Sequence, residues 1–245
     1  MNSPHENSEE APASLAAQKN TLKIWDLPVR LFHWGLVAAF VEAYTTHYLG
    51  ATYFKYHTWC GYSVIVLTMF RLVWGLVGTY HARFINFVRP PVATAHYIAS
   101  MIKKTDARHA GHNPLGGAMV IILLMALLAQ AFSGLFSNDE IFNLGPLYGY
   151  VSDDLSLSLT SLHRQLFYWI LGAVILHIIA VCLHVFFKRD NIVKAMLTGE
   201  KNAAGLEGVK EITSSRIGLA IIIVITLSTA LTWLIYSAPK IENNF

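Results

Sequence analysis

The chain has 245 residues, of which 54% are hydrophobic and only 13% are charged. A soluble domain of this size carries about a quarter charged residues, so the composition excludes an ordinary water-soluble protein. The deficit is concentrated in long apolar runs, as a lipid bilayer requires. The two cysteines form no CxxC motif, which excludes a zinc knuckle and covalent haem attachment.

Residues 1–22 are polar and poor in aromatic side chains, and we predict a disordered cytoplasmic tail. The first apolar run is too long for the core of a signal peptide, and no small-residue cleavage site follows it. We therefore expect no cleavable signal peptide. The run is interpreted as an uncleaved membrane anchor.

Five apolar segments are long enough, or nearly so, to cross a hydrocarbon core of about 30 Å at about 1.5 Å per residue. They cover residues 31–49, 58–78, 115–137, 162–187 and 217–236. A polar linker, residues 199–215, separates the last segment from the other four. The loop between the second and third segments is predicted to contain an amphipathic interfacial helix through Val92, Ala95, Ala99 and Ile102, or to be a plain solvated loop.

Lysine and arginine are distributed very unevenly among the loops. Fourteen of the 18 lie in the N-terminal tail and in the second and fourth loops, whereas the opposite side carries two, Lys55 and Lys240. The positive-inside rule therefore predicts a cytoplasmic N-terminus and a periplasmic C-terminus in a bacterial inner membrane. The third loop contains only acidic charges, which fit a docking site for a basic partner or simply the same rule.

The 11 histidines are numerous for so apolar a chain, and those inside the membrane are candidates for function. Neutral imidazole is a ligand of haem iron, and a haem with two axial imidazoles needs histidines from facing helices at equal depth. His163 and His177 lie 14 residues apart, so they share one helix face at a separation of about 21 Å. This spacing suits two stacked b-type haems. We prefer His177 to His184, which would place the inner haem among the lipid headgroups.

His33, near the cytoplasmic end of the first segment, is the natural partner for an inner haem. Spacing alone leaves two partners for an outer haem, His47 and His57. Gly61, one turn after His57, leaves room for a flat macrocycle. The remaining histidines, His5, His81, His96 and His109, are expected in solvent.

Several ordered motifs resemble the bacterial cytochrome b561 and nickel–iron hydrogenase b-type cytochrome family. They are WDLPVRLFHW at residues 25–34, RLVWG at 71–75 followed by Gly78, GHNPLG at 111–116, and the histidine pair of the fourth segment. The resemblance covers about residues 25–198. It implies an all-α integral membrane protein, a four-helix transmembrane di-haem bundle, to which this sequence adds a fifth C-terminal transmembrane helix.

The family implies two b haems, ligated once from the first helix, once from the second and twice from the fourth. Carried onto this sequence, the resemblance pairs His33 with His177 for the inner haem and His57 with His163 for the outer one. It favours His57 over His47. The implied domains are the tail 1–22, a di-haem domain 23–198, the linker 199–215 and a fifth helix with a short external tail, 216–245.

Three further polar residues are candidates for cofactor binding. Arg71 lies 14 residues after His57, at the cytoplasmic end of the second helix, where it would neutralise a haem propionate or reach a lipid phosphate. His112 and Asn113 open the third helix, where the resemblance to the cytochrome subunit of formate dehydrogenase implies a quinone near the inner haem. Asn113 is equally an N-cap, with Pro114 in the first helical position.

These patterns predict a transmembrane electron carrier between the quinone pool and a periplasmic redox protein, such as a c-type cytochrome, a hydrogenase or a dehydrogenase. It would be an electron-transfer subunit or a quinone oxidoreductase, bound to membrane lipid and to no nucleic acid. One alternative is a stand-alone oxidase of superoxide or another small molecule that reduces quinone. Another is a haem-free scaffold or transporter, which would show no Soret band.

Overall fold

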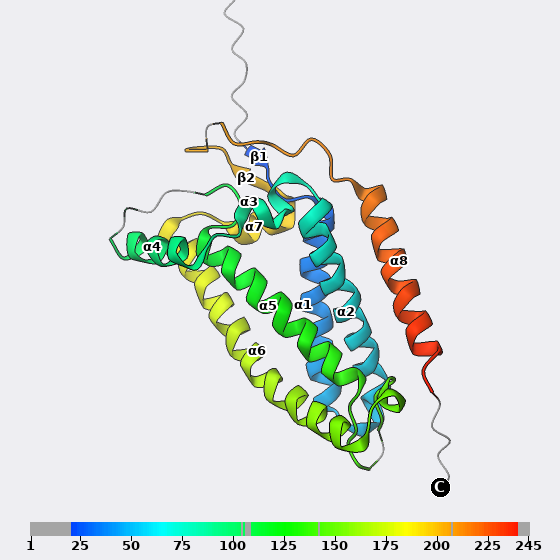
Figure 1. Ribbon diagram of the computed structural model, residues 1–245. Coiled ribbons are helices and arrows are strands. Elements are labelled where there is room, and N and C mark those ends of the chain that lie inside the picture. The colour runs from blue at the N-terminus through cyan, green and yellow to red at the C-terminus, as the bar shows by residue number, and fades with distance from the viewer. Residues whose placement is uncertain (1–20, 104, 106–108, 142, 207, 240–245) are drawn as a thin grey trace, which may run out of the picture.

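The computed structural model describes residues 21–239 except 104, 106–108, 142 and 207. The long helices form an elongated bundle with its small elements gathered at one end (Figure 1). The long helices are α1 (Leu27–Tyr48), α2 (Phe54–Val77), α5 (Pro114–Leu135), α6 (Asp153–Lys188) and α8 (Ile217–Tyr236). The shorter elements are β1 (Thr21–Lys23), η1 (Ala51–Tyr53), η2 (Tyr80–Ala82), α3 (Phe84–Phe87), α4 (Pro91–Ile102), η3 (Tyr148–Tyr150), α7 (Ile192–Thr198) and β2 (Glu200–Asn202).

Neighbouring helices pack in the order α1, α2, α5 and α6, and α8 lies along the outside of α2. In Figure 1, α5 and α6 diverge from α1 and α2 towards the end that carries the strands. Towards the other end α1 and α6 meet through aromatic side chains, with the rings of Tyr44 and Phe167 stacked 5.6 Å apart. The bundle is therefore closed at one end and splayed at the other.

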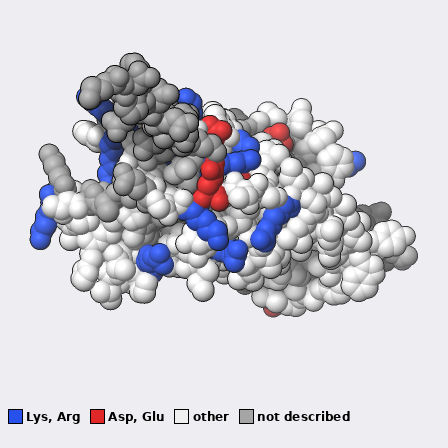
Figure 2. Space-filling view, turned by 90° about the horizontal axis from the view of Figure 1, so that it is seen from above, with Lys and Arg blue, Asp and Glu red and all other residues white. Residues whose placement is uncertain are grey.

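We call the splayed end, which carries β1, β2, α3, α4 and α7, the basic end, and the opposite end the far end. Figure 2 looks down on the basic end, where Lys and Arg side chains outnumber Asp and Glu among the coloured atoms. The two strands pair antiparallel, with Leu22 opposite Lys201. Gly199 accepts backbone hydrogen bonds from Ile24 and Trp25, which ties the chain before α1 to the chain after α7.

Buried Asp26 holds the start of α1 against the end of α2. One carboxylate oxygen caps α1 by accepting from the Val29 N–H at 2.7 Å. The other accepts from the Trp74 indole at 3.1 Å and from the Thr79 hydroxyl. A buried carboxylate is stable only when donors satisfy it, and here three donors do so.

The ends of α2 and α3 are brought together by a residue without a side chain. A Cβ at Gly75 would lie 2.0 Å from the ring of Phe84, so only glycine lets α3 fold back onto α2. This contact places Phe84 and Phe87 over the buried face of α2.

All five predicted segments are helical, with α6 much longer than expected at 36 residues. Among the described residues, four helices are long and apolar enough to cross a membrane: α2 with its preceding turn, α5, α6 and α8. The 22-residue α1, which contains Arg30 and Glu42, is less apolar than these four.

The smaller elements agree with the predictions in part. The helix expected in the second loop is confirmed as α4. The strand pair was not predicted, and it includes Thr21 and Leu22, which we had placed in the tail. The rest of that tail, residues 1–20, lies outside the described residues.

Candidate functional site

Two histidines from different helices meet at the far end of the bundle. The ring centres of His57 on α2 and His163 on α6 are 6.2 Å apart, with the ring planes at 81°. Each Nδ1 is within hydrogen-bond distance of a backbone carbonyl on the adjacent helix, Ala43 at 2.9 Å and Gln130 at 2.8 Å respectively. Because a carbonyl only accepts, each Nδ1 is protonated, and each Nε2 keeps its lone pair.

This arrangement has the dimensions of a site for a metal between two imidazoles. Two nitrogens at about 2 Å from one metal, with each ring centre about 1 Å further out, place the ring centres roughly 6 Å apart. A histidine that donates its other nitrogen to a carbonyl is also the usual form of a metal ligand, since that bond fixes the tautomer and the ring orientation. The far-end pair fits a bis-histidine haem on both counts.

The ring of His163 is seated by α5. Gly134 leaves the space for it, because a Cβ there would lie 2.8 Å from His163 Cε1. The Gln130 amide lies 3.2 Å from His163 Nε2 and donates to it. Space also exists around His57, because a Cβ at Gly61 would have nothing within 4 Å.

His47, the alternative to His57, lies in the same group but further from α6. Its ring centre is 5.9 Å from that of His57, and its side chain is exposed. His57 is the histidine in ring contact with His163. This arrangement supports His57 as the partner of His163, with His47 beside the pair.

His33 and His177 lie nearer the basic end and are held differently. Among the described residues they make no ring contact with each other, although they interact electrostatically at longer range. His33 Nδ1 is buried without a hydrogen-bond partner, and the side chain packs edge-on against Trp34 at 5.1 Å. The structure therefore places these two imidazoles in one neighbourhood of α1 and α6 without joining them.

Arg71, in α2 near the basic end, is buried, with 2% of its surface exposed. Both terminal nitrogens, Nη1 and Nη2, are buried and have no partner. Its guanidinium lies over the rings of Phe84 and Phe87, at 4.9 and 5.7 Å from their centres. A buried, unpartnered guanidinium is costly, and a carboxylate that binds in its fork would relieve this cost.

His112 is the third group with an unpartnered buried nitrogen at this end. It packs between the rings of Trp25 and Phe87, at 4.7 and 4.6 Å, and its Nδ1 is buried without a partner. Burial, followed by the charge of Arg71, lowers the pKa of His112 to about 3, so the imidazole is neutral. The adjacent Asn113 is confirmed as an N-cap, because its side chain accepts from the Gly116 N–H at 2.7 Å.

The unpartnered nitrogens of His33, Arg71 and His112 indicate which kind of cofactor would fit at the basic end. An iron porphyrin with carboxylate side arms offers a ligand-binding metal to imidazoles and an anion to a guanidinium. The donor set at the basic end therefore fits a haem as well. An apolar cluster, formed by Ala39, Val64, Leu127, Ala131 and Ile170, lies between the two histidine groups.

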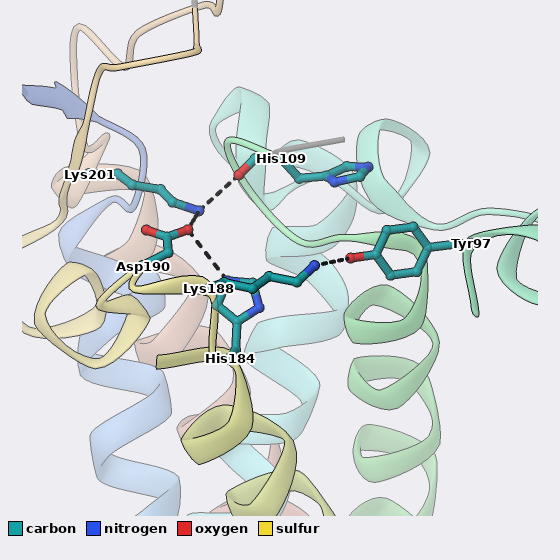
Figure 3. Close-up of polar contacts among 6 residues, drawn as sticks. All are labelled: Tyr97, His109, His184, Lys188, Asp190 and Lys201. Atoms are coloured by element: carbon teal, nitrogen blue, oxygen red, sulfur yellow. Dashed lines mark hydrogen bonds and ion pairs between the residues drawn. The ribbon is translucent and has the colours of Figure 1, made fainter. Parts of the chain in front are cut away.

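His184, the alternative to His177, contacts Asp190 at the end of α6, within a group of acidic and basic side chains (Figure 3). Its Nε2 is 3.4 Å from a carboxylate oxygen of Asp190, and the same oxygen is 2.9 Å from the Lys201 ammonium. Lys201 also donates to the His109 carbonyl at 2.8 Å. These contacts join the end of α6 to β2 and to the chain before α5.

The prediction that His81 is solvated was wrong. Its side chain is 8% exposed, and its Nε2 lies 2.7 Å from the Lys210 carbonyl, so it donates there. The linker that contains Lys210 folds back over the end of α2. Because His81 and Lys210 are far apart in sequence, no local sequence pattern predicts this contact. Burial lowers the pKa of His81, which keeps it neutral.

Sequence reasoning also missed Asp26, Gln130 and Gly134. Asp26 directly precedes a helix with proline in its first turn, which is an N-cap signature. Gln130 and Gly134 are one turn apart in an otherwise apolar helix, and a polar group there needs a partner. Both signals were present in the sequence.

Comparisons with known proteins identify the family of the chain. The model of the prokaryotic cytochrome b561 family matches residues 24–199, well over half of the chain. A relative from Cupriavidus necator, named "Probable Ni/Fe-hydrogenase B-type cytochrome subunit", is 26% identical over 78% of this chain and 91% of its own length. A protein of the same name from Rhizobium leguminosarum is 23% identical over 78% of this chain and 93% of its own. No solved structure matches.

Proposed function

Because the chain belongs to the prokaryotic cytochrome b561 family, a family of multi-pass membrane proteins that bind haem b, we propose that it is a di-haem electron carrier between the quinone pool and a redox partner. Haem iron alternates between ferric and ferrous states and so passes on one electron at a time. The polypeptide sets where each iron is held and which groups surround it. The observation that carries the proposal is the His57–His163 pair, with both Nδ1 atoms bonded to carbonyls.

His57 and His163 would hold the outer haem. Their carbonyl bonds, to Ala43 and Gln130, orient the rings before any cofactor enters and leave the lone pair on both Nε2 atoms, and the iron would displace the Gln130 amide that donates to His163 Nε2. A carbonyl acceptor also raises the basicity of the imidazole, which stabilises the ferric state.

His33 and His177 would hold the inner haem, and Arg71 would bind one of its propionates. Support comes from the buried, unpartnered Nδ1 of His33 and the unpartnered fork of Arg71. His163 and His177 lie on one continuous helix, which spaces the two ligation levels by about 21 Å along its axis.

Quinone would bind at the basic end, beside His112 and Asn113. The Trp25 and Phe87 rings supply a flat apolar surface next to the His112 imidazole, which would exchange a proton with a quinone oxygen through its unpartnered Nδ1. Asn113 is held in place by its capping bond. Replacing His112 with Ala should abolish quinone-linked oxidation of the haems, whereas haem content stays unchanged.

The basic end would face the cytoplasm of a bacterial inner membrane, with α1 as a fifth membrane-crossing helix. The names of the relatives favour a nickel–iron hydrogenase as partner. It would dock at the far end, where the first turn of α6 carries Asp153 and Asp154. A pulldown with the tagged full chain would test this pairing.

The haem assignment is tested with His33→Ala, His57→Ala, His163→Ala and His177→Ala, each purified in detergent. Each variant should lose one of two haems, so the haem-to-protein ratio should fall by about half. His96→Ala, on the exposed surface of α4, is the matched control. An unchanged ratio in all four variants would refute the proposal.

A further inference from the structure

A cavity of about 380 Å³ opens beside His112 at the basic end of the bundle. It lies between the segment of η2 and α3, the chain before α5 and the linker before α8. Its lining includes Tyr80, His81, Arg89, His109, His112 and Lys210. None of the described residues that line it is acidic.

The two cations of this cavity have no carboxylate partner among the described residues. Arg89 Nη2 donates to the Asn86 carbonyl at 3.1 Å, which leaves the rest of its fork available. The Lys210 ammonium lies over the Tyr80 ring, 5.4 Å from its centre. The acidic residue next to it, Glu211, is turned towards β1, where it accepts from the Lys23 N–H at 3.2 Å.

The imidazoles of His81 and His112 add hydrogen-bonding groups and no positive charge. Burial lowers the pKa values of His81 and His112, so both are neutral. The glycines Gly111 and Gly208 also lie in the wall, where the chain has no side chain to fill the space. The cavity thus presents two cations and several polar groups to an anion.

Exposed apolar side chains lie close in sequence to the residues that line the cavity. Ile85, in the same short helix as Asn86 and Phe87, is 81% exposed, and Val92 at the start of α4 is 67% exposed. Exposed aliphatic side chains next to unpaired cations are typical of a surface that lies in the lipid interface. Basic pockets between helices at a membrane surface bind the phosphates of lipid headgroups.

We propose that this cavity, with Arg89 and Lys210 at its mouth, binds the phosphate group of an anionic phospholipid. The site is separate from the groups assigned to haem and quinone, except that His112 and Phe87 form part of its wall. A headgroup phosphate held by Arg89 and Lys210 would fasten the linker before α8 to the segment between α3 and α4.

The test measures lipid binding to the purified full-length haem protein by native mass spectrometry in detergent. Phosphatidylglycerol is compared with diacylglycerol of the same acyl chains, which lacks the phosphate. Arg89→Gln combined with Lys210→Gln should weaken phosphatidylglycerol binding roughly 25-fold, at about fivefold for each basic residue. Lys194→Gln, an exposed lysine on α7 at the same end, is the matched control and should leave binding unchanged.

A second arm adds inorganic phosphate alone. If phosphate does not displace phosphatidylglycerol, the ligand is the lipid. If phosphate displaces the lipid only from protein that keeps Arg89 and Lys210, the cavity binds free phosphate by the same chemistry. Equal binding by the double variant and the Lys194→Gln control would overturn the proposal, as would equal binding of diacylglycerol. Helical circular dichroism and the haem spectrum of the double variant confirm that the fold is intact.

Discussion

The two histidine groups of this molecule differ in how completely the polypeptide satisfies them. At the far end His57 and His163 are in ring contact, and the Nδ1 of each is already bonded to a carbonyl. At the basic end the Nδ1 atoms of His33 and His112 and the terminal nitrogens of Arg71 are buried without partners. The far-end rings are oriented by hydrogen bonds within the protein, where Gln130 Oε1 alone of the described polar side-chain atoms beside them is buried without a partner, whereas the basic end requires a further group to satisfy several polar atoms.

The largest expected effect comes from disturbing the organised end. Gly134→Ala would introduce a Cβ 2.8 Å from His163 Cε1, which forces the ring from its seat on a rigid helix. We expect loss of the outer haem, so that total haem falls by about half, measured by the pyridine haemochrome assay. Gly35→Ala, whose Cβ would meet only the Leu67 side chain at 3.5 Å, is the control. Full haem content in Gly134→Ala would show that the far end is less rigid than we infer.

Substitutions of Asp26 at the basic end and of Ser152 at the far end compare how much the hydrogen bonds of each end contribute to the free energy of unfolding. Asp26→Ala removes the cap of α1 and leaves the Trp74 indole without its acceptor. We expect a loss of about 3 kcal/mol in the free energy of unfolding, measured by denaturant titration in detergent. Ser152→Ala, which removes only the cap of α6, should cost about 1 kcal/mol. Equal losses in the two variants would mean that the Trp74 and Thr79 bonds contribute nothing.

Substitution of Arg71 tests most directly whether the buried polar groups of the basic end lack partners within the protein. Arg71→Met keeps the volume and removes a buried charge without a partner, so the haem-free protein should gain about 1–3 kcal/mol of stability. The same change should weaken retention of the inner haem, measured by transfer to apomyoglobin. Destabilisation of the haem-free variant would show that the guanidinium is already satisfied within the protein.

The effect that is smallest near neutral pH is the pH dependence of the basic end. The pKa of His112 is lowered to about 3 by burial, so the unfolded chain binds a proton before the folded one does. Stability should therefore be constant above about pH 6.5 and fall as the pH decreases towards 3, by at most about 1.4 kcal/mol per unit. His112→Gln should flatten this slope in thermal unfolding measured at several pH values. An identical slope in the variant would assign the acid sensitivity to other groups.

The sequence predicted the helical bundle better than the contacts that complete it. The helices follow from apolar length, and the shared face of His163 and His177 follows from their spacing on one helix. The role of Asn113 as a cap was also readable, because capping is local. By contrast, the seat of His163 on Gly134 and the burial of His81 under Lys210 depend on segments that are distant in sequence. No periodicity within one helix specifies which neighbour it will touch.

The length of α6 has a mechanical consequence. Thirty-six helical residues extend for about 54 Å, whereas a tilt of about 40° uses only about 40 Å of helix within the hydrocarbon layer. About 15 Å of unbroken rod must therefore stand in the headgroup and water layers. Because this one helix carries both His163 and His177, a molecule that binds to its projecting turns would shift the two imidazoles together. Binding of such a molecule at the membrane surface would thereby move His163 and His177 together, with no loop between the binding site and the two histidines.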